Sequence, residues 1–208
     1  MIRRGNPHGR LVRPRQSPAM HLPDAWSPLI GADIYLLDLV LRGTIRPGAT
    51  VLDIGCGAGR NLPLLAHAGV TITAVDADPA AVASCSRLLA RMPGTHTCTV
   101  ASLPELGLAA GFDAVLCIAV LHFAPDQAGF HAWADACWQR LLPGGTFLAR
   151  LSTRIALPGV AAHFAYRPTL ADIVSCESRW RASRIDPLKT TLVEEQRVMS
   201  TWTLRKPI

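Results

Sequence analysis

Three glycines at alternate positions, Gly55, Gly57 and Gly59, lie in the segment "VLDIGCGAGRN" (residues 51–61). Glycine adopts unusual backbone dihedral angles and has no Cβ, so a ligand can rest directly against the main chain. Asp76 follows Gly55 by 21 residues. An acid at about this distance commonly holds ribose hydroxyls in nucleotide-binding βαβ units. The glycines and Asp76 together predict a site for an adenine nucleoside.

Alternating strand-like and helix-like segments must position this loop. The predicted strands are residues 50–54, 70–76, 95–100, 112–118 and 146–151, and the predicted helices are residues 33–42, 61–68, 79–92, 126–142 and 169–176. Two further strand-like runs, residues 180–185 and 197–204, have no long helix between them, which favours an antiparallel end to the sheet. The predicted fold is therefore α/β, with a doubly wound, mostly parallel, seven-stranded Rossmann-like sheet and an antiparallel C-terminal strand.

The length of 208 residues, half of them hydrophobic, suits one well-buried core. We expect a flexible basic arm over residues 1–23 and a single domain over residues 24–208. The arm holds five arginines before the first acid, Asp24, and so carries most of the net charge of +6. The remainder is nearly neutral, which disfavours a protein that coats nucleic acid. No apolar stretch reaches the length of a membrane span, so we expect no membrane partner.

The six cysteines form no C-x-x-C pair and have no histidine at zinc-finger spacing. Most of them fall in apolar segments, where a free cysteine packs as a small hydrophobic residue. This usage predicts a reduced, cytoplasmic protein that contains no structural metal.

The glycine order G-x-G-x-G, preceded by Asp53, differs from the G-x-G-x-x-G of dinucleotide-binding loops. The segment "DIGCGAG" resembles the first motif of class I S-adenosylmethionine-dependent methyltransferases. In the order found in that family, "AVDADP" (residues 74–79), "FDAVLCIAVLHF" (112–123) and "LLPGGTFLA" (141–149) resemble its later motifs. The likeness spans residues 51 to about 151. The addition of Arg60 and Asn61 also resembles the tellurite-resistance and thiol-type methyltransferases.

The resemblance implies S-adenosylmethionine as cofactor and a set of residues that would bind it. Asp76 would hold the ribose, and Ser102 or Ala101 stands where the family often has an aspartate that accepts from the adenine amino group. The residues that the resemblance implies for cofactor binding are Asp53, Gly55, Cys56, Gly57, Gly59, Asp76, Ala77, Ala101, Ser102, Leu103, Cys117 and Ile118.

The expected reaction is an in-line displacement that moves a methyl group to a small-molecule acceptor. Positioning accounts for much of such catalysis, and a base is needed only if the nucleophile arrives protonated. His122, after the fourth strand, and Arg150, near the end of the fifth, are the candidate catalytic residues. His122 would take or orient a proton, and Arg150 would pair with an anionic acceptor.

Three alternatives remain open from the sequence. The basic arm would suit an RNA methyltransferase, although nucleic acid is not the favoured partner. The sheet would suit an NAD(P)-dependent oxidoreductase, against which the glycine spacing argues. A non-enzymatic protein that binds the cofactor is the third. The acceptor atom and the oligomeric state do not follow from the sequence.

Overall fold

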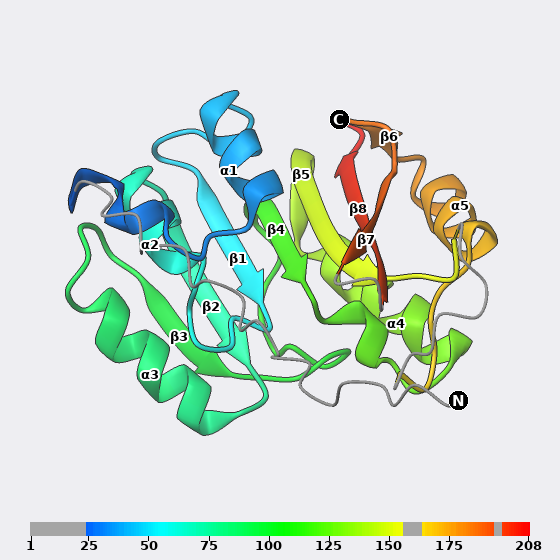
Figure 1. Cartoon of the computed structure of the whole chain (residues 1–208), viewed down its shortest axis with the longest axis horizontal. Coiled ribbons are helices and arrows are strands. Elements are labelled where there is room, and N and C mark those ends of the chain that lie inside the picture. Colours follow the sequence, from blue (N-terminus) through cyan, green and yellow to red (C-terminus); the bar gives the residue numbers. More distant parts are fainter. Residues whose placement is uncertain (1–23, 156–163, 194–196) are drawn as a thin grey trace, which may run out of the picture.

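The computed structural model describes residues 24–155, 164–193 and 197–208 (Figure 1). The arm expected over residues 1–23 lies outside these described residues. The described strands form one sheet in the order β3-β2-β1-β4-β5-β8-β6, and β7 also pairs with β8. Pairing is parallel from β3 through β5, whereas β8 is antiparallel to its neighbours. The predicted α/β sheet with its antiparallel C-terminal strand is confirmed, but it has eight described strands, not seven.

The parallel part of the sheet contains β1 (Thr50–Ile54), β2 (Thr71–Asp76), β3 (Thr97–Val100), β4 (Phe112–Ile118) and β5 (Leu141–Ser152). The antiparallel part contains β6 (Ser183–Arg184), β7 (Lys189–Val193) and β8 (Arg197–Arg205). The central strands β1 and β4 are buried along most of their length, as expected for strands covered on both faces. The glycine segment after β1 and the segment after β4 therefore both follow buried strands.

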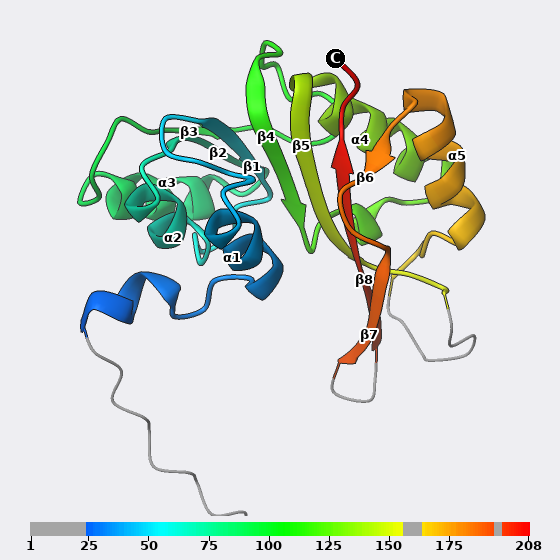
Figure 2. The same cartoon turned by 90° about the horizontal axis from the view of Figure 1, so that it is seen from above.

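Helices cover both faces of the sheet (Figure 2). The helices α1 (Ile34–Leu41), α2 (Leu62–His67) and α3 (Pro79–Leu89) lie on one face, and α4 (Gln127–Gln139) and α5 (Leu170–Trp180) lie on the other. Two short 3₁₀ segments, η1 (Asp24–Leu29) and η2 (Leu121–Phe123), were not predicted. None of the described helices is long and apolar enough to cross a membrane.

Adjacent residues of the central strands point to two separate cores. Leu116 of β4 packs with Leu148 of β5 and Ile72 of β2 on the side of α1 to α3. Val115 packs with Phe147 and Trp202 on the side of α4 and α5. This alternation follows from the two-residue period of a strand. It decides on which side of the sheet each motif residue projects.

The prediction was wrong at two places in the second half of the chain. Trp180 ends α5 and does not begin a strand, because Thr169 and Asp172 form a capping box that starts a helix of three turns. Strand β6 is therefore only two residues long, and β7 was missed. Strand β5 begins at Leu141, within the range predicted for the preceding helix (residues 126–142), and α4 already ends at Gln139.

Candidate functional site

The loop after β1 contains three glycines with positive φ, and each of them has different surroundings. Gly55 has φ 72°, and a Cβ on it would collide with the side chain of Val120. Gly57 has φ 51°, and a Cβ on it would meet nothing within 4 Å. A Cβ on Gly59 would lie 3.0–3.1 Å from Leu62, Cys85 and Leu88. Gly59 therefore permits helix packing, whereas Gly57 leaves space for a ligand.

Asp76, at the end of β2, is oriented by the main chain around it. Its Oδ2 accepts a hydrogen bond of 2.8 Å from the Gly57 N–H, and its Oδ1 accepts one of 3.0 Å from the Asp78 N–H. Asp78 itself caps α3 by accepting from the Ala80 N–H. A carboxylate has about four acceptor positions, so Asp76 keeps capacity for two hydroxyl donors.

A cavity of about 410 Å³ opens beside Gly57 and Asp76. Its volume falls within the range typical of sites for small molecules and cofactors. Of the residues predicted to bind the cofactor, those that line it are Gly55, Gly57, Asp76, Ala77, Ala101, Ser102 and Leu103. The sequence reasoning missed five lining residues, namely Ile54, Ala119, Val120, Phe123 and Trp133.

The other predicted cofactor residues lie around this cavity without lining it. Cys56 is buried, with its Sγ 3.5 Å from that of Cys85, and burial raises the pKa of its thiol. Cys117 points into the core beneath α4 and is fully buried. Gly59 packs against helices, as described above. Ile118 lines a second cavity.

Asp53 is the buried acid of the motif. Its side chain is almost inaccessible, and its Oδ2 has no hydrogen-bond partner among the described residues. Burial raises the pKa of this carboxyl to about 7, and the nearby Arg60 opposes that rise. A positive charge bound in the adjoining cavity would offset part of the cost of burying this carboxyl. S-adenosylmethionine carries such a charge and two ribose hydroxyls for Asp76, so the residues present fit this cofactor.

The second cavity, of about 320 Å³, adjoins the first at Ala119. Ala119 has φ 65°, an unfavourable conformation for a residue with a Cβ, and its N–H donates to the Arg150 carbonyl oxygen at 2.7 Å. Such strained residues often occur at functional sites. The lining comprises Arg60, Ile118, Ala119, His122, Arg150, Val193 and Met199. Both candidate catalytic residues thus lie at this cavity and not at the first.

Asp33, the N-cap of α1, holds the two arginines of the second cavity. Its fully buried carboxylate accepts from Arg150 Nη1 at 2.8 Å and lies 3.7 Å from Arg60 Nη2. Its backbone N–H donates to Asn61 Oδ1 at 2.9 Å. Sequence reasoning did not identify Asp33 as a site residue, because its partners lie far away along the chain.

His122 is buried at the edge of the same cavity. Its Nδ1 accepts a hydrogen bond of 3.1 Å from the Ser152 N–H. A neutral imidazole with Nδ1 as acceptor carries its proton on Nε2. In this tautomer His122 is poorly suited to take a proton from an acceptor.

Another cavity, of about 570 Å³, lies between the start of β4 and the turn of β5, around Asp113 and Gly144. It is at the amino ends of the parallel strands. Ligands of open α/β sheets bind at the carboxyl ends, so we do not assign the cofactor to this cavity. Among the described residues, no group of histidine, cysteine and acidic side chains is placed to hold a metal ion.

Comparison with known proteins agrees with this geometry. Residues 52–149 match the family described as "Methyltransferase domain". A ubiquinone biosynthesis O-methyltransferase of Xanthomonas campestris pv. campestris (strain B100) is 33% identical over 151 residues, which cover 67% of this chain and 60% of that protein. The chain therefore matches less than two thirds of the length of this relative.

Solved structures share the fold at low sequence identity. The magnesium protoporphyrin IX methyltransferase ChlM of Synechocystis PCC 6803, with bound S-adenosylhomocysteine, has a TM-score of 0.69 and 17% identity, covering 89% of both chains. The [4+2]-cyclase SpnF has the same TM-score at 14% identity, covering 84% of this chain and 80% of its own. The sequence motifs, the matching family and the Xanthomonas relative support a class I S-adenosylmethionine-dependent methyltransferase with S-adenosylmethionine as its cofactor, and the solved structures share its fold.

Proposed function

We propose that this chain transfers the methyl group of S-adenosylmethionine to an oxygen atom of a small molecule. The observation that carries the proposal is the pair of adjoining cavities, which meet at Ala119. One cavity is built from the cofactor motifs, and the other contains the two candidate catalytic side chains. The name of the Xanthomonas relative, an O-methyltransferase, supports oxygen as the accepting atom.

The first cavity would hold the cofactor. Asp76 would accept from the ribose hydroxyls, while Ser102 and Leu103 would border the adenine. Gly57 would allow close approach to the main chain, and Asp53 would provide the negative charge beneath. When bound, S-adenosylmethionine supplies an electrophilic methyl group attached to a positively charged sulfur.

The second cavity would hold the acceptor. Its apolar residues Ile118, Val193 and Met199 would surround the carbon skeleton, and His122 would border the accepting oxygen atom. The protein contributes mainly by holding the reactants together, which can be worth about 7–11 kcal/mol. On this proposal His122 and Arg150 position the acceptor, and His122 does not act as a base.

The proposal also covers the extent of the domain, its location in the cell and the type of acceptor. We place its activity in a single domain over residues 24–208 and its location in the cytoplasm. The six cysteines support the location, since none forms a disulfide in the described part of the chain. The acceptor partner is a small molecule and not a nucleic acid.

Calorimetric titration with S-adenosylhomocysteine tests the cofactor site. Asp76→Ala should weaken binding by about tenfold to a hundredfold, because it removes charge-assisted hydrogen bonds to the ribose. Asp78→Ala is the matched control: it removes the cap of α3, lowers stability by about 1 kcal/mol and leaves affinity unchanged. Absence of binding to the unchanged protein, or tight binding of NAD in its place, would refute the proposal.

A further inference from the structure

We infer that the second cavity recognises its acceptor through a carboxylate, which Arg150 and Arg60 bind together. The inference deepens the proposed function and rests on it, since it names the class of acceptor. It starts from the charges around the cavity. Arg60 and Arg150 bring two positive charges, and Asp33 brings one negative charge. These three side chains therefore carry a net charge of +1 beside the cavity, and buried Asp53 is a further acid near Arg60.

The arginines retain hydrogen-bonding capacity. Arg150 has five N–H donors, and within the described residues its guanidinium makes one hydrogen bond, from Nη1 to Asp33. Its Nε is buried and has no partner among those residues. Arg60 Nη2 lies 3.7 Å from Asp33, an ionic contact longer than a hydrogen bond. Planar guanidinium groups with unused donors match the two oxygens of a carboxylate.

Arg150 is held in place by its neighbours, so its guanidinium is suited to bind an anion in one defined orientation. Asp33 fixes one side of its guanidinium, and the ring of Tyr35 lies with its centroid 5.3 Å from Arg150 Cζ. The side chain is 21% exposed, so most of its motion is already restricted by the protein. A preorganised donor loses little entropy on binding an anion.

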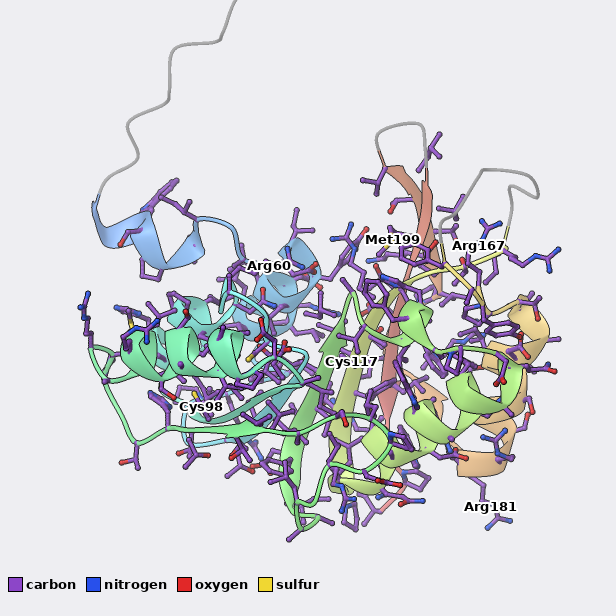
Figure 3. All side chains as sticks on the ribbon, turned by 90° about the horizontal axis from the view of Figure 1, so that it is seen from below. Arg60, Cys98, Cys117, Arg167, Arg181 and Met199 are labelled. Atoms are coloured by element: carbon purple, nitrogen blue, oxygen red, sulfur yellow. The ribbon has the colours of Figure 1, made fainter. Side chains whose placement is uncertain are left out.

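The position of the arginines points to the acceptor and not to the cofactor. Neither Arg60 nor Arg150 lines the cavity of the glycine loop. The second cavity is also lined by Met199 of β8 and Val193 of β7, strands that carry no cofactor motif. Figure 3 shows Arg60 beside the loop after β1 and Met199 on β8, with the end of β4 between them.

The remaining lining limits the rest of the acceptor. Ile118, Val193 and Met199 are apolar, and at about 320 Å³ the cavity suits a compact molecule. The geometry thus points to a small, mainly apolar hydroxy acid, with its carboxylate at the arginines.

The test compares two probes of the same shape, 3,4-dihydroxybenzoate and 3,4-dihydroxybenzamide, which differ in charge. Calorimetry with saturating S-adenosylhomocysteine measures the affinity for each probe. In a separate assay with S-adenosylmethionine, the formation of S-adenosylhomocysteine measures turnover. We expect the carboxylate to bind at least about tenfold more tightly than the amide, because one charge-assisted contact is at stake. Arg60→Gln should remove most of this preference without unfolding the protein, since Arg60 is half exposed.

Arg150→Lys is the second variant, because it keeps a cation beside Asp33 but loses the planar fork. It should also reduce the preference for the carboxylate over the amide by about tenfold, while His122 and the cofactor site stay in place. Arg91→Gln, an exposed arginine after α3, is the matched control and should leave both affinities unchanged.

The outcomes separate the inference from the proposed function. If S-adenosylhomocysteine does not bind the unchanged protein, the proposed function fails first. If it binds normally but neither probe binds, or the two bind alike, the carboxylate inference is wrong and the cofactor site stands. If the arginine variants weaken S-adenosylhomocysteine and not the carboxylate preference, the arginines serve the cofactor, and the inference is likewise overturned.

Discussion

The three glycines of the loop after β1 have different surroundings, although the motif treats them alike. Gly57 borders open space next to Asp76, whereas Gly59 touches α2 and α3 through Leu62 and Cys85. A methyl group added at Gly59 would meet the protein, and on the proposed function one added at Gly57 would meet the cofactor. The motif thus combines a binding requirement with a packing requirement.

Alanine substitutions should separate these two roles. Gly57→Ala is expected to lower the affinity for S-adenosylhomocysteine markedly, with a loss of stability of about 1–2 kcal/mol from its positive φ. Gly59→Ala carries the same backbone cost and adds overpacking against three side chains, so its total loss should be larger, about 2–4 kcal/mol. Urea unfolding and calorimetry on both variants measure the two effects. Equal stability losses with equal affinity losses would contradict the assignment.

Asp53 provides a second prediction at this scale, through pH. Burial raises the pKa of its carboxyl to about 7, above the value near 4 of an unfolded chain. Between these two values the folded protein binds more protons at Asp53 than the unfolded chain does. The contribution of Asp53 to the free energy of unfolding therefore falls as the pH rises from about 4 to 7.

Asp53→Asn should remove this dependence. The difference in unfolding free energy between variant and wild type should move in favour of the variant by about 1 kcal/mol or more from pH 4 to pH 8. Urea unfolding of both proteins across this range provides the measurement, without cofactor. A difference that does not change with pH would show that Asp53 titrates normally.

At the scale of the element, α1 and α5 are fixed by their ends. Asp33 attaches the start of α1 to Arg150 of β5, and Arg42 attaches its end to Asp186 through two hydrogen bonds. At the start of α5, buried Asp172 accepts from Thr169, Tyr166 and Gln127 at 2.6–2.7 Å. These contacts join α5 to α4 through Gln127, and they join α1 to β5 through Arg150.

Removal of the Asp172 carboxylate should destabilise this element strongly. Burial alone would raise its pKa, but the hydrogen bonds outweigh burial and keep the pKa well below the usual range. Asp172→Ala leaves several donors unpaired and should lower the unfolding free energy by about 2–4 kcal/mol at neutral pH. The wild type should lose this advantage as the pH falls below about 4, where the unfolded carboxyl takes up its proton. Unfolding free energies of wild type and variant that converge at low pH would confirm the prediction. A difference that stays constant with pH would contradict it.

At the scale of the whole molecule, the two cavities lie at one edge of the sheet and on both sides of Ala119. The loops after β1, β2, β3 and β4 contribute to the first cavity, and β5, β7 and β8 contribute side chains to the second. The fold itself does not decide the reaction, since the [4+2]-cyclase SpnF shares it. On the proposed function, the side chains at the second cavity would decide which acceptor is methylated.

The basic arm should be unnecessary for this chemistry. Residues 1–19 lie outside the described structure, and every residue lining the two cavities lies beyond them. Deletion of residues 1–19 is expected to leave affinity for S-adenosylhomocysteine and turnover of a small acceptor unchanged. Loss of activity toward RNA alone would instead support the RNA methyltransferase alternative.

The sequence by itself determined the cofactor loop, the parallel core of the sheet and most helix starts. These are local features: the backbone freedom of Gly57, the strand pattern before it and the cap at Asp78 depend on neighbouring residues. Only the tertiary structure brought Asp33 to Arg150, 117 positions away along the chain, and placed Met199 opposite Arg60. Those contacts depend on strand order and on the packing of α1 against β5, which no local pattern encodes.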